Sequence, residues 1–565
     1  MGKHSKNTIN IKSRKKDKNK IDKKPIEKNM SEKELERELK KQKKDAKKNS
    51  KLRKKLKKII IFIILISILI FAIVKGISMY KWQTLAKEMM SNTNSVIVDK
   101  DGNIIATLGS EKIHKNISFS EMPDNLKNAY VAIEDERFYK HHGVDIKRTG
   151  SAIVSYVIHF GSSSFGGSSI TQQLVKNITG NDTSSISRKV EEWSKAMELE
   201  FCLSKEEILE SYLNIIYVGP NIYGVEMGAK YYFNKSAKDL SLEECAFLAG
   251  INHSPNSYNP FGDTDRLDKI KKRTKLVLDK MLELKYISNE DYEKAISNVE
   301  KGLNFKKGDL SPEDDAIYSY HTDAVISQVI QDISKEKKLD TTFTTNYLNR
   351  AGLTIYSTQD SSIQKQMEEE FEKSKHIIKS KNDSAVTSQA AMVIIDHTRG
   401  YVVGCVGGLG KKTTSRGFNR ATQGIRQTGS SSKPLTVLVP GIDKKIFTAS
   451  TIFDDKQTSF IDRKKENYSP TNNSGYLGKI TVRRATESSQ NIPFVEMMEK
   501  ITPSTSIKYL EKMGITTLTE KDNNLALALG GLDKGISPLE MAGAYSTLAN
   551  DRSIYRTNFL HKDYK

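Results

Sequence analysis

Cysteine is scarce in this chain of 565 residues, which contains only three. Cys202, Cys245 and Cys405 lie far apart and are odd in number. This pattern excludes a disulfide scaffold and lacks the spacing of a metal site, so we expect all three to be small buried apolar residues. A typical domain has about 100–200 residues, and the length therefore predicts two or three folded units.

Acidic and aromatic residues are both scarce near the amino terminus. Residues 1–58 contain 25 Lys and Arg, only 8 Asp and Glu, and no aromatic residue. Such a segment cannot bury enough apolar surface to offset its ordering entropy, and we expect a disordered basic tail. The alternation of Glu and Lys allows a short helix near residues 32–48. The tail holds +17 of the net charge of +21, which excludes a global nucleic-acid-binding surface.

A long hydrophobic run follows the tail. Residues 59–74 contain no charge, and residues 59–80 are long enough to cross a hydrocarbon core of about 30 Å. Lys75 can snorkel, while Tyr80 and Trp82 suit the far interface. A buried core helix and a cleaved signal peptide are the alternatives, and the absence of a small-residue cleavage site disfavours the second. We predict a single-pass anchor with a cytoplasmic amino terminus, whose tail attracts anionic lipids.

Residues 95–300 form the first predicted unit outside the membrane. Residues 95–106 read as a hairpin. Apolar residues at spacings of three and four then predict helices over 125–138, 187–203, 205–217, 242–249 and 266–284.

Polar clusters interrupt these helices. Glu134, an aromatic residue and a histidine gather at one helix end, where acidic residues alone are usually solvated. Two adjacent glutamines, hydroxyls and a lysine within residues 166–177 suit sugar hydroxyls or a diphosphate. Arg188 and Glu192 are four residues apart and share one helix face.

Five ordered blocks between residues 96 and 260 together resemble the peptidoglycan glycosyltransferase domain of class A penicillin-binding proteins. They are Glu-Asp-x-x-Phe-x-x-His-x-Gly at 134–143, Gly-x-Ser-x-Ile-Thr-Gln-Gln at 166–173, Arg-Lys-x-x-Glu at 188–192, Ile-Leu-Glu-x-Tyr-Leu-Asn at 208–214, and Tyr-Gly-x-Glu at 223–226. Ser169 stands where the family usually has Thr, and the hydroxyl is kept.

The resemblance implies inverting transfer of a glycan chain from a polyprenyl diphosphate to the 4-hydroxyl of lipid II. It makes Glu134 the general base and Glu192 a second catalytic acid that orients substrate or holds a divalent cation such as Mg²⁺. Lys176 and Arg188 would offset the charge of the leaving diphosphate. The substrate-binding positions implied by the resemblance are Asp135, Phe138, His141, Gly167, Ser168, Thr171, Gln172, Gln173, Lys176, Arg188, Lys189, Asn214 and Tyr223.

Beyond a predicted linker region at 301–385, a second unit covers residues 386–565. Residues 390–396 and 400–407 predict a hairpin. Ser430 and Lys433 precede a helical apolar run, which puts hydroxyl and amine on one face near the positive end of a helix. This layout suits activation of a serine by a base, although Ser-x-x-Lys alone is common by chance.

The surrounding motifs resemble the penicillin-binding transpeptidase domain of the same class. Phe-Asn-Arg-Ala at 418–421 stands upstream, and Ser489-Gln-Asn491 begins 59 residues beyond Ser430. The resemblance implies that Ser430 is acylated by a D-Ala-D-Ala stem peptide or a β-lactam, with Lys433 as base and no cofactor. Ser489 and Asn491 would serve as proton relay and substrate-amide contact.

The third family motif, Lys-Thr-Gly or Lys-Ser-Gly, does not occur after Asn491. It would supply a cationic clamp and part of the oxyanion hole, so we predict an incomplete and inactive transpeptidase domain. The last fifteen residues, 551–565, are interpreted as a truncated or out-of-frame end.

The predicted fold is therefore multidomain. A transmembrane helix at 59–80 leads to a mainly α, lysozyme-like glycosyltransferase domain and then to an incomplete α/β, serine β-lactamase-like penicillin-binding domain. We expect a cell-membrane protein with its catalytic domains outside. Its partners would be lipid II, the growing glycan strand and cell-wall assembly proteins, with no nucleic acid. The alternative is a non-catalytic scaffold that binds lipid II or partner proteins.

Overall fold

The computed structural model describes residues 32–109, 113–151, 167–183, 185–262, 266–308, 310, 317–381, 387–462, 467–550 and 554–561. It divides into two units, Met1–Tyr80 and Lys81–Lys565. Each unit is described by itself below.

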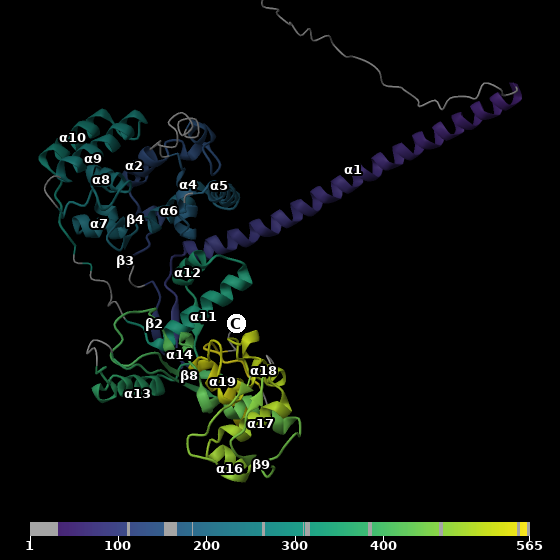
Figure 1. Cartoon of the computed structure of the whole chain (residues 1–565). Coiled ribbons are helices and arrows are strands. Elements are labelled where there is room, and N and C mark those ends of the chain that lie inside the picture. Colours follow the sequence, from purple (N-terminus) through teal and green to yellow (C-terminus); the bar gives the residue numbers. More distant parts are fainter. Residues whose placement is uncertain are drawn as a thin grey trace, which may run out of the picture. The chain divides into compact units, whose positions relative to one another are not determined.

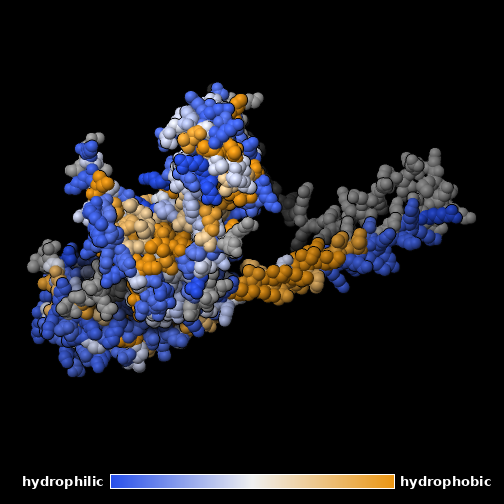
Figure 2. Space-filling view, turned by 90° about the horizontal axis from the view of Figure 1, so that it is seen from below, coloured by the Kyte–Doolittle hydropathy of each residue, from blue (hydrophilic) through white to orange (hydrophobic). Residues whose placement is uncertain are grey.

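The first unit consists of helix α1 (Glu32–Met90) as far as Tyr80 (Figure 1). The predicted membrane span lies within it, and its apolar side chains are exposed as a continuous band (Figure 2). Among the described residues, α1 is the one helix long and apolar enough to cross a membrane. Residues 32–58 are helical rather than disordered, which corrects the prediction for that stretch. Glu and Lys at i,i+4 spacing favour this helix. Residues 1–31 lie outside the described residues.

The last turns of α1, from Lys81 on, belong to the second unit. Trp82 is buried, and its indole Nε1 donates to the carbonyl of Lys195 at 3.2 Å. Gln83 Nε2 donates to the carbonyl of Glu198 at 2.9 Å. The Trp82 ring therefore packs into protein, and its expected place at the membrane interface stays a prediction.

A helical bundle forms the first part of this unit (Figure 1). Its main elements are α2 (Asp124–Glu134), α4 (Ile170–Thr179), α5 (Ile186–Glu200), α6 (Lys205–Ile215), α7 (Val225–Phe233), α8 (Leu242–Ile251), α9 (Arg266–Glu283) and α10 (Asn289–Lys301). A small sheet of order β3-β5-β4 joins β3 (Ile113–His114), β5 (Ile222–Tyr223) and β4 (Tyr217–Gly219). Every predicted helix is present. Beyond Glu243 and Glu244 in its first turn, helix α8 is apolar on all sides and buried, so it forms the centre of the bundle.

The predicted linker is a folded region. It contains α11 (Tyr320–Lys337), α12 (Thr341–Arg350), β6 (Thr354–Tyr356) and α13 (Ser361–Phe371). Strand β6 runs parallel to β1 (Val96–Val98), which pairs antiparallel with β2 (Ile104–Thr107). The predicted hairpin thus exists, but it shares a sheet with β6 and a core with this region and β8, so the expected boundaries at 300 and 385 cut through one structural unit.

The second catalytic region begins with the predicted hairpin of β7 (Met392–Asp396) and β8 (Tyr401–Val406). The elements after it are α14 (Arg420–Gln423), η5 (Gly429–Ser432), η6 (Pro434–Leu438), α15 (Val439–Asp443), β9 (Ile452–Asp455), β10 (Phe460–Ile461), β11 (Asn467–Tyr468), β12 (Gly478–Thr481), α16 (Val482–Glu487), α17 (Asn491–Ile501), α18 (Pro503–Lys512), η7 (Glu520–Asp522), η8 (Leu525–Leu529) and α19 (Pro538–Ala549). Strand β9 pairs with β12 and β10 with β11, both antiparallel. Helix α17 packs its buried face, including Phe494 and Met497, into the core beneath η6.

Residues 558–561 are built into this unit. Asn558 exchanges backbone hydrogen bonds with Gly400 and Val402, each at 2.9 Å. Phe559 is buried, with its ring centroid 5.0 Å from that of His321. These contacts argue against an out-of-frame end for this stretch. Residues 551–553 and 562–565 lie outside the described part of the chain. Cys245 and Cys405 are buried as expected, and Cys202 is half-buried.

Candidate active sites

Glu134 is the last residue of α2, and neutral side chains hold its carboxylate. Oε2 accepts a hydrogen bond from Gln173 Nε2 at 2.8 Å, and Oε1 accepts one from Asn252 Nδ2 at 3.1 Å. Tyr212 closes a ring, since its hydroxyl donates to Gln173 Oε1 and accepts from Asn252 Nδ2, both at 2.9 Å. Four elements thus fix one half-exposed carboxylate, and no cation among the described residues pairs with it.

Tyr212 is the buried member of this ring. Burial, together with the nearby charge of Glu134, raises the pKa of Tyr212 well above its usual value, so the hydroxyl stays a donor. The sequence reasoning did not select Tyr212 or Asn252 as site residues. Tyr212 lay inside a recognised block. Asn252 is the polar C-cap that follows the apolar run Cys245–Ile251 of α8, which was the available signal.

The neighbouring Asp135 is fully buried. Its Oδ2 accepts from the backbone N–H of Ile170 at 3.0 Å and lies 2.9 Å from His141 Nε2. Asp135 therefore anchors the first residue of α4 and orients His141. Burial gives this carboxylate a positioning role, and its predicted contact with substrate finds no support in the geometry.

Gly143 ends the same block where the loop passes the backbone of α5. Its φ is +85°, and a Cβ there would lie 2.7 Å from the backbone of Ala196. The hydroxyl of Ser169, the residue that caps α4, donates to the Gly143 carbonyl at 2.5 Å. Glycine is therefore required for α2, α4 and α5 to approach each other here.

A second polar cluster lies on α4 and α5. Arg188 and Lys189 both form ion pairs with Glu192, which is 5% exposed. Lys189 Nζ also donates to Ser168 Oγ at 2.7 Å. Lys176, Arg188 and Glu192 line one small cavity of about 40 Å³. The structure thus brings together the predicted cations and the second predicted acid.

The environment of Glu192 does not fit a divalent cation. Two cationic side chains already occupy its two oxygens, and a metal ion would add to their positive charge. In the described ranges, no group of three His, Cys, Asp or Glu side chains could hold a metal ion.

Four other predicted substrate contacts are buried: Phe138, Thr171, Gln172 and Asn214. Asn214 bridges the backbone of Ile117, accepting at 3.0 Å and donating at 2.9 Å. Thr171 Oγ1 donates to Glu200 at 2.6 Å. These side chains hold the bundle together. Gly167 and Tyr223 are half-buried, and their roles stay predictions.

In the second region, Lys433 lies at the buried base of the site and is 2% exposed. Its Nζ donates to the Ser489 carbonyl and to Asn491 Oδ1, both at 2.8 Å, and to Ser489 Oγ at 3.2 Å. Burial lowers the pKa of Lys433 to about 8. The amine can therefore lose its proton near neutral pH, as a general base requires.

Ser430 is exposed on the short helix η5, three residues before Lys433. A side chain at Gly530 would overlap the backbone of Gly429, which precedes Ser430. The Tyr545 hydroxyl donates to the Ser431 carbonyl at 2.5 Å. Ser489 adopts a φ of +50°, a strained conformation often found at functional sites. Lys433, Ser489 and Asn491 are thus in hydrogen-bond contact, and Ser430 lies on the short helix that leads into Lys433.

Each of the two regions matches the model of a known protein family. Residues 101–282 match the model of the Transglycosylase family, and residues 390–565 match the Penicillin binding protein transpeptidase domain. Penicillin-binding protein 1A of Clostridium perfringens (strain 13 / Type A) is 33% identical over 488 residues, which are 83% of this chain and 70% of the relative. The chain belongs to the class A penicillin-binding proteins. The family prediction and the predicted fold class are confirmed.

Other class A relatives are longer than this chain. Penicillin-binding protein 1A of Clostridium botulinum (strain Langeland) is 40% identical over 471 residues, which cover 81% of this chain and 57% of the relative. The chain thus spans little more than half the length of this relative. Among solved structures, Penicillin-Binding Protein 1A from Haemophilus influenzae aligns with 81% of this chain and 68% of its own, at 20% identity and a TM-score of 0.45.

Proposed function

We propose that this class A penicillin-binding protein polymerises lipid II into glycan strands with Glu134 as general base. The observation that carries the proposal is the ring of Gln173, Tyr212 and Asn252, which holds a half-exposed carboxylate without neutralising it. A base must lie about 2.6–3.2 Å from the proton that it removes, which requires a fixed carboxylate.

In this reaction Glu134 takes the proton of the 4-hydroxyl of lipid II as that oxygen attacks the anomeric carbon of the donor chain. The bond from the anomeric carbon to the diphosphate oxygen breaks, and its electron pair leaves with the diphosphate. Lys176 and Arg188 stabilise the charge that develops on the leaving group. Glu192 keeps Arg188 and Lys189 in place through its two ion pairs.

Polymerisation of lipid II by the full chain in detergent tests this assignment. Glu134→Gln is expected to lower the rate by about 10²–10⁴-fold, the usual contribution of a general base. Glu136→Gln is the matched control, because Glu136 is an exposed carboxylate two residues away. An active Glu134→Gln variant contradicts the assignment. No product from the wild-type chain favours a scaffold that binds lipid II without turnover.

At the second site we propose Ser430 as the nucleophile toward a D-Ala-D-Ala stem peptide or a β-lactam. Neutral Lys433 takes the hydroxyl proton, Ser489 relays it to the leaving amine, and Asn491 contacts the substrate amide. A polypeptide of these 565 residues contains no Lys-Thr-Gly or Lys-Ser-Gly after Asn491, and we propose that it is not a functional transpeptidase.

Labelling of the 565-residue polypeptide with a fluorescent penicillin tests this second part. We expect slow labelling that is lost in Ser430→Ala and kept in Ser431→Ala, because the Ser431 hydroxyl is bonded to the carbonyl of Thr428. Labelling at the rate of full-length relatives contradicts the proposed inactivity. Labelling that survives Ser430→Ala contradicts the choice of nucleophile.

We also propose that the chain crosses the membrane once, with residues 1–58 in the cytoplasm and both catalytic regions outside. The basic tail before the span and the apolar band of α1 support this orientation. Protease added to intact cells is expected to digest the catalytic regions and spare the tail. Digestion of the tail contradicts this topology.

A further inference from the structure

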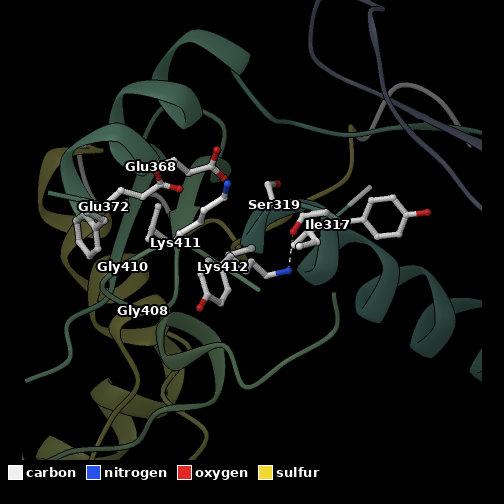
Figure 3. Close-up of a pocket in the computed structure, with 12 residues that line it drawn as sticks. Ile317, Ser319, Glu368, Glu372, Gly408, Gly410, Lys411 and Lys412 are labelled. Carbon is white, nitrogen blue, oxygen red and sulfur yellow. Dashed lines mark hydrogen bonds between the residues drawn. The ribbon is translucent and has the colours of Figure 1, made fainter. Parts of the chain in front are cut away.

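A cavity of about 190 Å³ lies where α13 faces the chain that follows β8 (Figure 3). Residues 317–320, the end of α13 and residues 406–412 form its walls. None of these residues belongs to the Glu134 ring or contacts Lys433. The cavity has room for a small molecule.

One wall of this cavity is acidic. Glu368 and Glu372 lie one turn apart on α13 and in the first residue after it, and they share a helix face. Gln364 Nε2 donates to Glu368 Oε1 at 2.8 Å, and burial raises the pKa of Glu368. Neither carboxylate forms an ion pair in the described structure. Two like charges at this spacing repel, so a cation between them is favoured.

The opposite wall offers one free ammonium group. Figure 3 shows Lys411 turned toward Glu368 and Glu372, and it forms no ion pair with a described residue. Lys412 differs, because its Nζ pairs with Asp323 at 2.8 Å and donates to the Tyr318 carbonyl at 2.5 Å. Lys412 is therefore part of the wall, and its charge is neutralised.

Apolar surface lies between the charged walls. Phe371 and Val406 are nearly buried, and the Tyr320 ring lies 5.2 Å from Lys412 Nζ. A ligand that matches all three features carries an ammonium and a carboxylate close together and a small apolar group. A simple amine leaves Lys411 unpaired, and a simple carboxylate leaves the two glutamates unpaired.

We propose that this cavity, here named the α13 pocket, binds a free α-amino acid. Its ammonium lies between Glu368 and Glu372, its carboxylate binds Lys411, and a small side chain rests on Phe371 and Val406. Nothing in this assignment depends on either proposed catalytic activity.

Calorimetric titration of the full chain in detergent tests the α13 pocket. The probes are glycine and alanine, with ethylamine, acetate and the dipeptide Gly-Gly as comparisons. We expect an amino acid to bind, and each comparison to bind at least about tenfold more weakly. Equal binding of ethylamine overturns the proposal in favour of a simple cation site. Equal binding of Gly-Gly overturns it in favour of a peptide-end site, and no binding by any amino acid also overturns it.

Matched variants locate the binding. Glu372→Gln and Lys411→Met are each expected to weaken binding of the best amino acid about tenfold. Glu369→Gln and Lys365→Met are the controls, since these two exposed residues lie on α13 outside the pocket. All four positions are surface-exposed, so folding is expected to persist and is checked by melting temperature. Equal losses in pocket and control variants contradict the location.

Discussion

The two proposed bases, Glu134 and Lys433, are both held by neutral groups, but they differ in how exposed they are to solvent. Glu134 keeps a half-exposed carboxylate between amide donors, and the fully buried charge belongs to its neighbour Asp135. Lys433 is itself buried, and its hydrogen bonds run to carbonyl and side-chain oxygens. In the first site, the buried residue is Asp135, which holds neighbouring groups in position. In the second site, the base Lys433 is itself buried, and this burial lowers its pKa.

The helices that present the two sites also begin differently. Helix α4 starts with a capping box, in which Ser169 and Gln172 bond each other's backbone. The turn of Ser430 has no side-chain cap and relies on Gly530 and Tyr545, more than a hundred residues away along the chain. The start of α4 is thus specified by local sequence, and the turn of Ser430 is held mostly by distant packing.

The largest expected effect comes from removing the buried charge beside Glu134. Asp135→Ala leaves His141 and the Ile170 N–H without their acceptor, and we expect the helical bundle to lose about 3–5 kcal/mol of stability. Calorimetric melting of the full chain measures the loss. Asp124→Ala is the control, because that carboxylate is 88% exposed. Equal effects of the two substitutions contradict the positioning role.

The next prediction concerns Lys433, whose pKa is 10.5 when solvated and about 8 in the folded chain. Between these pH values the unfolded chain binds more protons, so this residue makes stability rise with pH from about 8 to 10.5. Below pH 8 its destabilising effect is complete and constant. Lys433→Met is expected to raise the melting temperature of the transpeptidase region most at or below pH 8, and this gain shrinks toward pH 10.5. Lys444→Met, at an exposed lysine, is expected to show no such trend. A gain that grows above pH 8 contradicts the buried amine.

The sequence predicted contiguous motifs well, and it predicted burial and contacts between distant residues poorly. The blocks around Glu134, Gln173 and Arg188 were found because each is contiguous and sits at a helix end. The burial of Asp135 was missed, since the sequence pattern does not say which of two adjacent acidic residues at a helix end is covered by protein. Asn252 was missed because it meets Glu134 only when the ends of α8 and α2 come together, 118 residues apart.

Long-range pairing explains the other differences. The region at 301–385 was interpreted as a linker from the mixed Lys, Asp and Thr composition of its first part. The sequence does not show that β6 pairs with β1, about 260 residues earlier. Asn558 and Phe559 were interpreted as part of an irregular end, yet they form hydrogen bonds with residues of β8 and α11. Periodicity predicts which residues are buried, but it does not identify what they contact.

A smaller effect is expected at Asn252, which joins Glu134 to Tyr212. A hydrogen bond to a charged group is worth about 1.5–3 kcal/mol, so Asn252→Ala is expected to lower kcat for lipid II polymerisation by about tenfold or more and leave KM unchanged. Asn252→Asp is expected to be worse, because it places a like charge beside Glu134. His253→Ala, at an exposed neighbour, is the control. A rise in KM alone indicates substrate contact and contradicts the positioning of Glu134.

The smallest expected effect on stability compares the start of α4 with the turn of Ser430. Ser169→Ala removes the cap of α4 and its bond to Gly143, which is expected to lower stability by about 1 kcal/mol. Ser169→Thr keeps the capping hydroxyl and is expected to lower stability by less than Ser169→Ala does. Ser431→Ala at the other site is expected to be equally mild, since the exposed Ser431 hydroxyl only bonds a carbonyl within its own turn. If Ser431→Ala proved as damaging as Ser169→Ala, the Ser430 turn would depend on its own side chains, and the contrast between local capping and distant packing would not hold.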